Sequence, residues 1–163
     1  MVLLGQEVIA PYVKPDADGA PLYRLPGRPG QLLPYLGYAP GAYLGQMVDL
    51  ILKQSGTAIH FDRVYETDMA EGLKAMALEG HGIAFLPHSA VKKELRAKRL
   101  VSAVPPEITG LEITMDVRAY REAPAAGKDG HRAGAPSGKA AVPPHKRSAQ
   151  ALWDYLLTQS SPK

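Results

Sequence analysis

Cysteine is absent from the 163 residues of this chain. Without a thiol, the chain can form no disulfide, zinc–thiolate or iron–sulfur site and has no cysteine nucleophile. Aromatic residues are also few, at 7%, although 45% of the residues are apolar and 21% are charged, as in an ordinary globular domain. A chain of this length can bury one substantial core. We therefore expect one folded domain in a reducing, cytoplasmic setting.

Long apolar runs are missing as well. No run approaches the roughly 20 apolar residues that a membrane-spanning helix needs. Residues 1–7 (MVLLGQE) lack the basic start, the sustained apolar stretch and the small-residue cleavage site of a signal peptide. The sequence therefore predicts neither membrane insertion nor export.

Catalytic and metal-binding motifs are absent too. The chain has no Gly-x-Ser-x-Gly, P-loop or Gly-x-Gly-x-x-Gly pattern, and Gly80-x-Gly82 stands before an apolar run rather than after one. His60, His81 and His88 lack the spacing of a zinc-binding helix. We expect no enzyme activity, no cofactor and no metal site.

The net charge of +3 is unevenly distributed. Residues 1–122 hold 13 Lys and Arg against 14 Asp and Glu, whereas residues 123–163 hold 6 against 2. A protein that neutralises phosphates needs basic residues over a whole face. The body of this chain has only the cluster at 92–99, which is typical of a solvated helix face, so no direct DNA binding is expected.

Apolar periodicity predicts alternating strands and helices in the first half of the chain. Strands are expected at Val2–Ile9, ended by Pro11, at Leu33–Tyr38 and at Thr57–Tyr65. A helix is expected from Ala42 to Ser55. A second helix is expected after Asp68, with Asp68 and Glu71 as a capping box and with a buried stripe of Met69, Leu73, Met76 and Ala77.

The second half continues this alternation. The expected elements are a strand at 83–86 that is covered on both faces, a helix at 90–97 capped by Ser89, strands at 100–104 and 111–120, and a helix at 148–159. Residues 123–147 hold four Pro, four Gly and seven Ala but no aromatic residue, which indicates a flexible basic linker. The order predicts an α/β fold with a largely parallel sheet.

The segment from Tyr35 to Leu95 resembles the effector-binding domain of LysR-type transcriptional regulators. The resemblance lies in YLGYAPGAYLGQMVDLIL, in the helix, Gly-x-Gly, apolar strand and Leu-Pro order of residues 73–87, and in LWDYL at 152–156. It implies a type 2 periplasmic-binding-protein-like fold, in which two α/β lobes are joined by two crossing strands with a small-molecule site between them.

On this resemblance, residues 1–122 form one complete lobe with both crossing strands, 123–147 form a flexible insertion, and 148–163 hold the docking helix of the other lobe. The family's winged helix-turn-helix would lie upstream of Met1 and is absent, so contact with DNA is expected only through that missing domain. An incomplete second lobe predicts exposed apolar surface at Ile113, Met115 and Trp153, and hence self-association.

The candidate effector site begins at the first helix. A helix start offers unpaired N–H groups to an anion, and in the resembled family this turn often carries a hydroxyl residue that holds a carboxylate. The candidate residues are Ala39, Pro40, Gly41, Ala42 and Tyr43, then Thr67 at the next helix start, and Gly80, His81 and Gly82. A plain helix start and a plain helix stop remain the alternative interpretations of the first and last groups.

The resemblance therefore predicts the effector-binding regulatory domain of a LysR-type regulator, which senses a small, anionic ligand. The alternative is a stand-alone ligand-binding or protein-interaction module with no role in transcription. Met76 is expected in the core, with reversible oxidation of its thioether as the alternative role.

Overall fold

The computed structural model describes residues 1–121 and 144–159. The chain divides into two compact units, one formed by Glu7–Met115 and the other by Met1–Gln6 with the segment that starts at Asp116. Among the described residues, no helix is long and apolar enough to cross a membrane.

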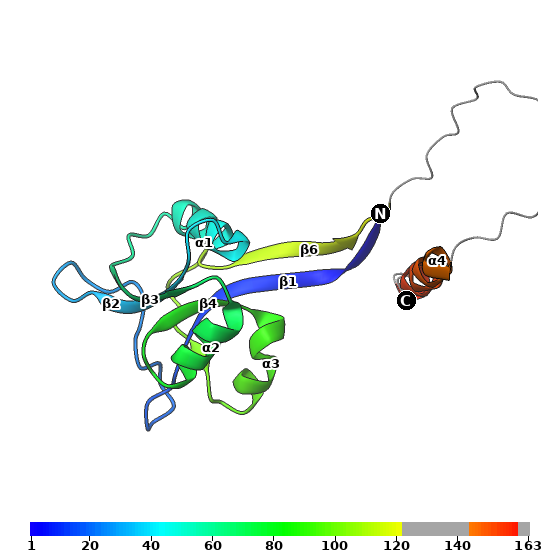
Figure 1. Ribbon diagram of the computed structural model, residues 1–163. Coiled ribbons are helices and arrows are strands. Elements are labelled where there is room, and N and C mark those ends of the chain that lie inside the picture. Colours follow the sequence, from blue (N-terminus) through cyan, green and yellow to red (C-terminus); the bar gives the residue numbers. More distant parts are fainter. Residues whose placement is uncertain (122–143, 160–163) are drawn as a thin grey trace, which may run out of the picture. The chain divides into compact units, whose positions relative to one another are not determined.

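The described strands form one six-stranded sheet (Figure 1). They are β1 (Val2–Val13), β2 (Leu33–Tyr38), β3 (Phe61–Thr67), β4 (Ile83–Pro87), β5 (Val101–Ser102) and β6 (Ile113–Ala119). The order is β3-β2-β4-β1-β5, and β6 pairs with β1. β2 runs parallel to β3 and β4, but β1 is antiparallel to β4 and β5. The prediction of a largely parallel sheet was wrong, because periodicity carries no information on strand direction.

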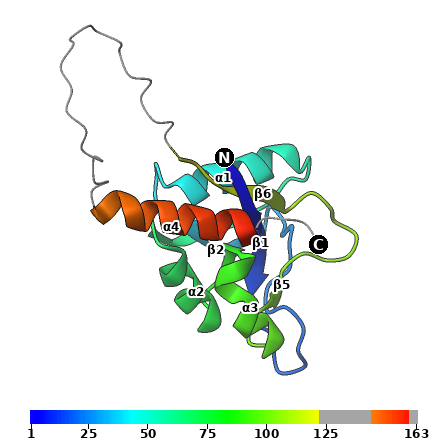
Figure 2. The same cartoon turned by 90° about the vertical axis from the view of Figure 1, so that its right-hand side faces the viewer.

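Three helices belong to the larger unit: α1 (Tyr43–Gln54), α2 (Ala70–Leu78) and α3 (His88–Arg96). Figures 1 and 2 show α1 on one side of the sheet and α2 and α3 on the other. β4 lies between these layers, and its residues 83–86 are fully buried. This confirms the prediction of a strand covered on both faces.

β1 continues through Pro11 to Val13, so the expected end of this strand at Pro11 was wrong. Proline has no N–H to donate, but the Pro11 carbonyl still accepts the Ala103 N–H at 3.1 Å. The strand expected at 57–65 begins only at Phe61 and reaches Thr67, and the strand expected at 100–104 is reduced to β5.

The predicted capping box at Asp68 is not formed. α2 begins at Ala70, Met69 occupies the cap position, and the Thr67 hydroxyl accepts the Met69 N–H at 3.4 Å. Met69 therefore lies before the helix and is 62% exposed, contrary to the prediction that it is buried. Leu73 and Ala77 are buried as expected, and Met76 packs partly against the core.

Ser89 does not cap α3 either, because the helix already begins at His88. The Ser89 hydroxyl and N–H both donate to the Glu7 carboxylate, which reaches the helix start from β1. The acceptor that this helix start needs comes from a residue 82 positions away in the chain.

Residues 123–143 of the predicted flexible segment lie outside the described residues. Its last four residues, 144–147, belong to α4 (Pro144–Gln159), so this helix begins four residues before the expected position 148. Proline suits the first turn of a helix, because it lacks an N–H and the N–H groups of that turn have no intrahelical acceptor. The helix predicted at 148–159 is confirmed as the larger part of α4.

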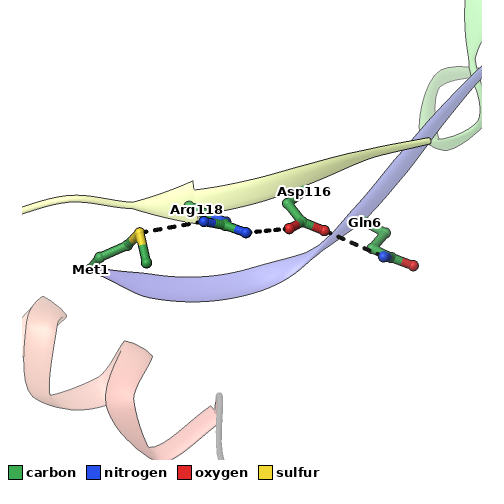
Figure 3. A network of polar contacts seen from close by, with 4 residues as sticks. All are labelled: Met1, Gln6, Asp116 and Arg118. Carbon is green, nitrogen blue, oxygen red and sulfur yellow. Dashed lines mark hydrogen bonds and ion pairs between the residues drawn. The ribbon is translucent and has the colours of Figure 1, made fainter. Parts of the chain in front are cut away.

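Polar side chains follow one side of the paired ends of β1 and β6 (Figure 3). Arg118 forms an ion pair with Asp116 at 2.5 Å, and the Gln6 amide donates to the other Asp116 oxygen at 3.3 Å. A guanidinium N–H of Arg118 also contacts the Met1 sulfur at 3.7 Å. The Arg118 hydrogen bond holds the pKa of Asp116 below its ordinary value.

Candidate functional site

A cavity of about 200 Å³ lies between the start of α1, the end of β2 and the edge strand β3. Its walls include four of the predicted site residues, Ala39, Pro40, Gly41 and Ala42. The other lining residues are Tyr35 and Tyr38 on β2, Gly45, Gln46 and Asp49 on α1, and Arg63 on β3. All of them belong to the unit Glu7–Met115.

The turn from β2 into α1 is set by its backbone. The Ala39 N–H donates to the Thr67 carbonyl at 2.9 Å, which extends the pairing of β2 with β3 past the end of β2. Gly41 then adopts a φ of +85°, a left-handed conformation that costs glycine little. The Ala42 N–H bonds back to the Ala39 carbonyl at 3.1 Å, so the chain turns sharply and α1 begins at the wall of the cavity.

The start of α1 is bare. It has no side-chain cap and no acidic residue in its first turn. By contrast, α2 has Glu71 in its first turn with the Thr67 hydroxyl nearby, and α3 has Glu7. The first N–H groups of α1 meet no acceptor side chain among the described residues. The partial positive charge of the helix start is therefore left open to a ligand.

Arg63 forms the wall of the cavity on β3. Its guanidinium donates to the Tyr38 carbonyl at 3.1 Å and to the Glu66 carboxylate at 2.8 Å. It also lies 5.5 Å from the centre of the Tyr35 ring. A Cβ at Gly37 would stand 2.9 Å from the Arg63 Cζ, so glycine at this position lets the side chain lie along β2.

Tyr35 is only 6% exposed, and its ring stacks on Phe61 at 4.4 Å. Its hydroxyl forms no hydrogen bond with any described residue. No fully buried side-chain N or O among the described residues lacks a partner, so this hydroxyl oxygen is not fully buried, and Tyr35 lines the cavity.

The Tyr35 hydroxyl is a hydrogen-bond donor at neutral pH. Burial raises the pKa of Tyr35 to about 12, with Arg63 opposing the rise and Asp49 adding to it. Both charged groups line the same cavity as the tyrosine. The cavity thus holds one protonated phenol together with the open start of α1.

The structure places the other predicted residues away from this cavity. The exposed Tyr43 hydroxyl contacts the Met115 sulfur at 3.9 Å. The Thr67 side chain packs at the start of α2, where a Cβ at Gly72 would be 3.2 Å from its methyl group. Residues 80–82 come immediately before β4, which runs parallel to β2. They therefore lie at the end of the sheet where β2 begins, whereas the cavity lies where β2 ends.

A second, wider groove of about 640 Å³ lies at the end of β1 and the turn after α3. Lys14, Lys98 and Arg99 line it together with Glu79. Lys98 has a φ of +54°, the only left-handed residue other than glycine in the described ranges. Its three cations are exposed to solvent.

Sequence reasoning missed Tyr35, Asp49 and Arg63. The spacing of Ala42, Gly45, Gln46 and Asp49 is a signal that could have revealed part of the site, because these small and polar residues share one face of α1. Arg63 could not be found in this way. It joins the site only because β3 pairs in parallel with β2, with Tyr35 opposite Arg63.

Comparison with known proteins gives consistent matches. The family model described as LysR substrate binding domain matches residues 3–128. The HTH-type transcriptional regulator YjiE of Escherichia coli (strain K12) is 31% identical over 100 residues, which cover 61% of this chain and 32% of that protein. The HTH domain-truncated transcriptional regulator QseD of Escherichia coli O157:H7 is 35% identical over 68 residues, 42% of this chain and 28% of that protein.

The fold is also similar to solved structures. The regulatory domain of HypT from Salmonella typhimurium (apo-form) matches with a TM-score of 0.61 and 26% identity. That match covers 71% of this chain and 52% of the solved chain. The chain spans about a third of the length of the curated relatives that it matches.

Proposed function

The chain belongs to the LysR substrate-binding domain family, and from that premise we propose that its unit Glu7–Met115 binds a small effector in the cavity at the start of α1. The fold is the periplasmic-binding-protein-like fold of LysR regulatory domains. Effector binding in a transcription regulator follows from this family, whereas the place of the effector is our proposal.

The bare start of α1 is the observation that carries the proposal. The helix begins at the wall of a cavity of small-molecule size, which Ala42 and Gly45 line, and the Tyr35 hydroxyl is a further donor. Donors that converge at a helix start favour a carboxylate or another small anion. Ala39, Pro40, Gly41 and Ala42 would supply the backbone wall of this site. Tyr43, Thr67 and residues 80–82 remain candidates for contact outside the cavity.

We extend this proposal to the role of the domain in the whole regulator. The domain acts by binding rather than by catalysis, in the cytoplasm, with residues 1–122 as the effector lobe and its crossing strands. It self-associates, and contact with DNA comes from a separate winged helix-turn-helix domain. The net negative charge of residues 1–122 supports this division of roles, because DNA repels an acidic body.

Ala42→Asp tests the place of the effector. The new carboxylate would cap α1 and occupy the N–H groups that the ligand needs. We expect the variant to gain about 1 kcal/mol in the free energy of unfolding. We also expect it to lose at least tenfold in affinity for acetate and butyrate, measured by isothermal titration calorimetry. Gain of stability with loss of ligand is the signature of a helix start that serves as a binding site.

Ala58→Asp is the matched control, because Ala58 is exposed and lies outside the cavity walls. It adds the same charge to the same unit and should leave carboxylate affinity unchanged. Equal affinity of the wild type and of Ala42→Asp for these carboxylates would show that the start of α1 is not the site.

A further inference from the structure

We infer that the effector carries an amino group as well as a carboxylate, and that Asp49 binds this amino group inside the cavity. The inference rests on the proposed function, because it concerns the ligand of the same cavity. It changes the class of ligand from a simple anion to a zwitterion.

The charges around the cavity are the first reason. Arg63 is already paired with Glu66 at 2.8 Å, so the charge of its guanidinium is locally balanced. Asp49 is exposed and lines the cavity, and its side chain forms no ion pair or hydrogen bond with any residue in the described ranges. The unpaired side-chain charge of the cavity is therefore negative, and it repels a ligand that is only an anion.

The hydrogen-bond donors of the cavity are the second reason. The first N–H groups of α1 can donate to an oxyanion, and the Tyr35 hydroxyl is a further donor among the cavity-lining residues. Tyr35 is more than nine-tenths buried, and its hydroxyl has no partner within the described part of the chain, so it needs one from a ligand or from water. One end of the cavity thus favours a carboxylate, while Asp49 favours an ammonium group.

The spacing of these two ends limits the ligand. Asp49 follows Ala42 by two turns of α1, a rise of about 10 Å at 1.5 Å per residue. Helical side chains lean toward the N-terminus, which shortens the gap by several ångströms. The remaining separation is larger than that between the two charged groups of an α-amino acid. A flexible ω-amino acid spans it, and Gln46 lies between the ends as an amide that can bond either group.

Matched pairs of small molecules test this inference. Glycine, γ-aminobutyrate and ε-aminocaproate are each titrated into the full chain beside acetate, butyrate and caproate, by isothermal titration calorimetry at neutral pH. We expect γ-aminobutyrate or ε-aminocaproate to bind about tenfold more tightly than the carboxylate of the same length, the scale of a hydrogen bond to a charged group. Glycine is expected to gain nothing over acetate, because its ammonium group cannot reach Asp49.

Asp49→Asn assigns the effect to a residue. It should abolish the tenfold preference for the amino member of the pair and leave the affinity for butyrate unchanged or higher. Asp62→Asn is the matched control, because this exposed carboxylate lies next to Arg63 on β3 but outside the cavity walls. It should keep the preference intact.

The outcomes separate the inference from the proposed function. Butyrate and γ-aminobutyrate that bind equally, with both affinities lost in Ala42→Asp, would overturn the role of Asp49 and leave the effector site in place. A preference that survives in Asp49→Asn would overturn it as well. The absence of binding by every member of both series would overturn the site and the inference together.

Discussion

Two tyrosines on β2 differ in what their hydroxyls contact. The Tyr38 hydroxyl donates to the buried Phe85 carbonyl at 2.9 Å, and burial raises the pKa of Tyr38 far above its ordinary value. The Tyr35 hydroxyl has no such partner among the described residues, although both side chains lie in the same strand. One hydroxyl therefore serves the fold, and we assign the other to the ligand.

This difference predicts opposite results for two identical changes. Tyr38→Phe should lower the free energy of unfolding by about 1 kcal/mol, because it removes a buried hydrogen bond and leaves the buried Phe85 carbonyl without that donor. Tyr35→Phe should leave stability within about 0.5 kcal/mol of the wild type but weaken carboxylate binding several-fold. Urea unfolding and calorimetry measure the two quantities. A Tyr35→Phe variant that loses as much stability as Tyr38→Phe would contradict the assignment.

Lys98 gives the second prediction at this scale. Its left-handed φ of +54° after α3 is held by hydrogen bonds of the Lys98 N–H to Leu95 and the Arg99 N–H to Glu94. A side chain in this conformation costs roughly 1–2 kcal/mol, which glycine avoids. We expect Lys98→Gly to raise the free energy of unfolding by about 0.5–1 kcal/mol.

Lys98→Ala is the control for that change. It removes the same amino group but keeps a Cβ, so the backbone cost remains and no gain in stability is expected. If both variants were equally stabilised, charge repulsion in the basic groove rather than backbone conformation would be the cause.

At the scale of elements, the start of α3 depends on a distant strand. The Glu7 carboxylate accepts the Ser89 hydroxyl, the Ser89 N–H at 3.1 Å and the Val8 N–H at 3.1 Å. Burial alone would raise the pKa of Glu7, but these hydrogen bonds and the nearby His88 together hold it below its ordinary value. Glu7 is also the first residue of the larger unit, so this contact ties the end of that unit to a helix.

A lowered carboxyl pKa fixes the sign of the pH dependence. The stabilisation is complete above the unfolded-state pKa, which is 4.5, and is lost as pH falls through the lower folded-state value. Glu7→Gln should cost about 1 kcal/mol at neutral pH and flatten the loss of stability below pH 4.5. Urea unfolding at a series of pH values measures this effect.

Glu107→Gln is the corresponding control, since Glu107 is exposed and has no hydrogen bond or ion pair in the described structure. This variant should follow the wild-type pH curve. A Glu7→Gln curve with the wild-type slope in acid would show that the cap does not titrate with folding.

The sequence predicted which helices and strands exist better than it predicted the residues at which they begin and end. Each expected helix exists, because a 3.6-residue apolar period needs no knowledge of neighbours. The cap at Asp68 failed because α2 begins only at Ala70, with Met69 at the cap position. The cap at Ser89 failed because the acceptor at the start of α3 is the distant Glu7, which tertiary structure brings there. Strand ends differ from the predicted ones because pairing with other strands sets them. β3 begins at the residue where its pairing with β2 begins, and β5 contains only the two residues that pair with β1.

At the scale of the whole molecule, both units carry exposed apolar side chains, and those of the smaller unit include Leu3, Leu4 and Val117. Ile113, Met115 and Trp153 are half-buried, so they expose less apolar surface than expected. Leu4 is 46% exposed, and Tyr120 and Tyr155 are exposed as well. Apolar surface on strands of a small unit favours association between chains.

We therefore expect the 163-residue chain to sediment faster than a monomer of 17.5 kDa at high concentration. Leu4→Glu should shift it toward the monomer in sedimentation velocity. Leu22→Glu, at an exposed leucine of the larger unit, should not. A wild-type chain that stays monomeric across the concentration series would contradict this expectation.

The sequence by itself determined the class of fold, the family and the turn at which α1 begins, because apolar period, glycines and prolines act within a few residues of one another. The tertiary structure decided the direction of β1, the acceptor at the start of α3, and most of the candidate site. Tyr35 and Arg63 are 28 positions apart in the sequence and meet only through the pairing of β2 with β3. A binding site made by strand pairing is absent from any local pattern, because hydrogen-bonded neighbours in a sheet need not be neighbours in the chain.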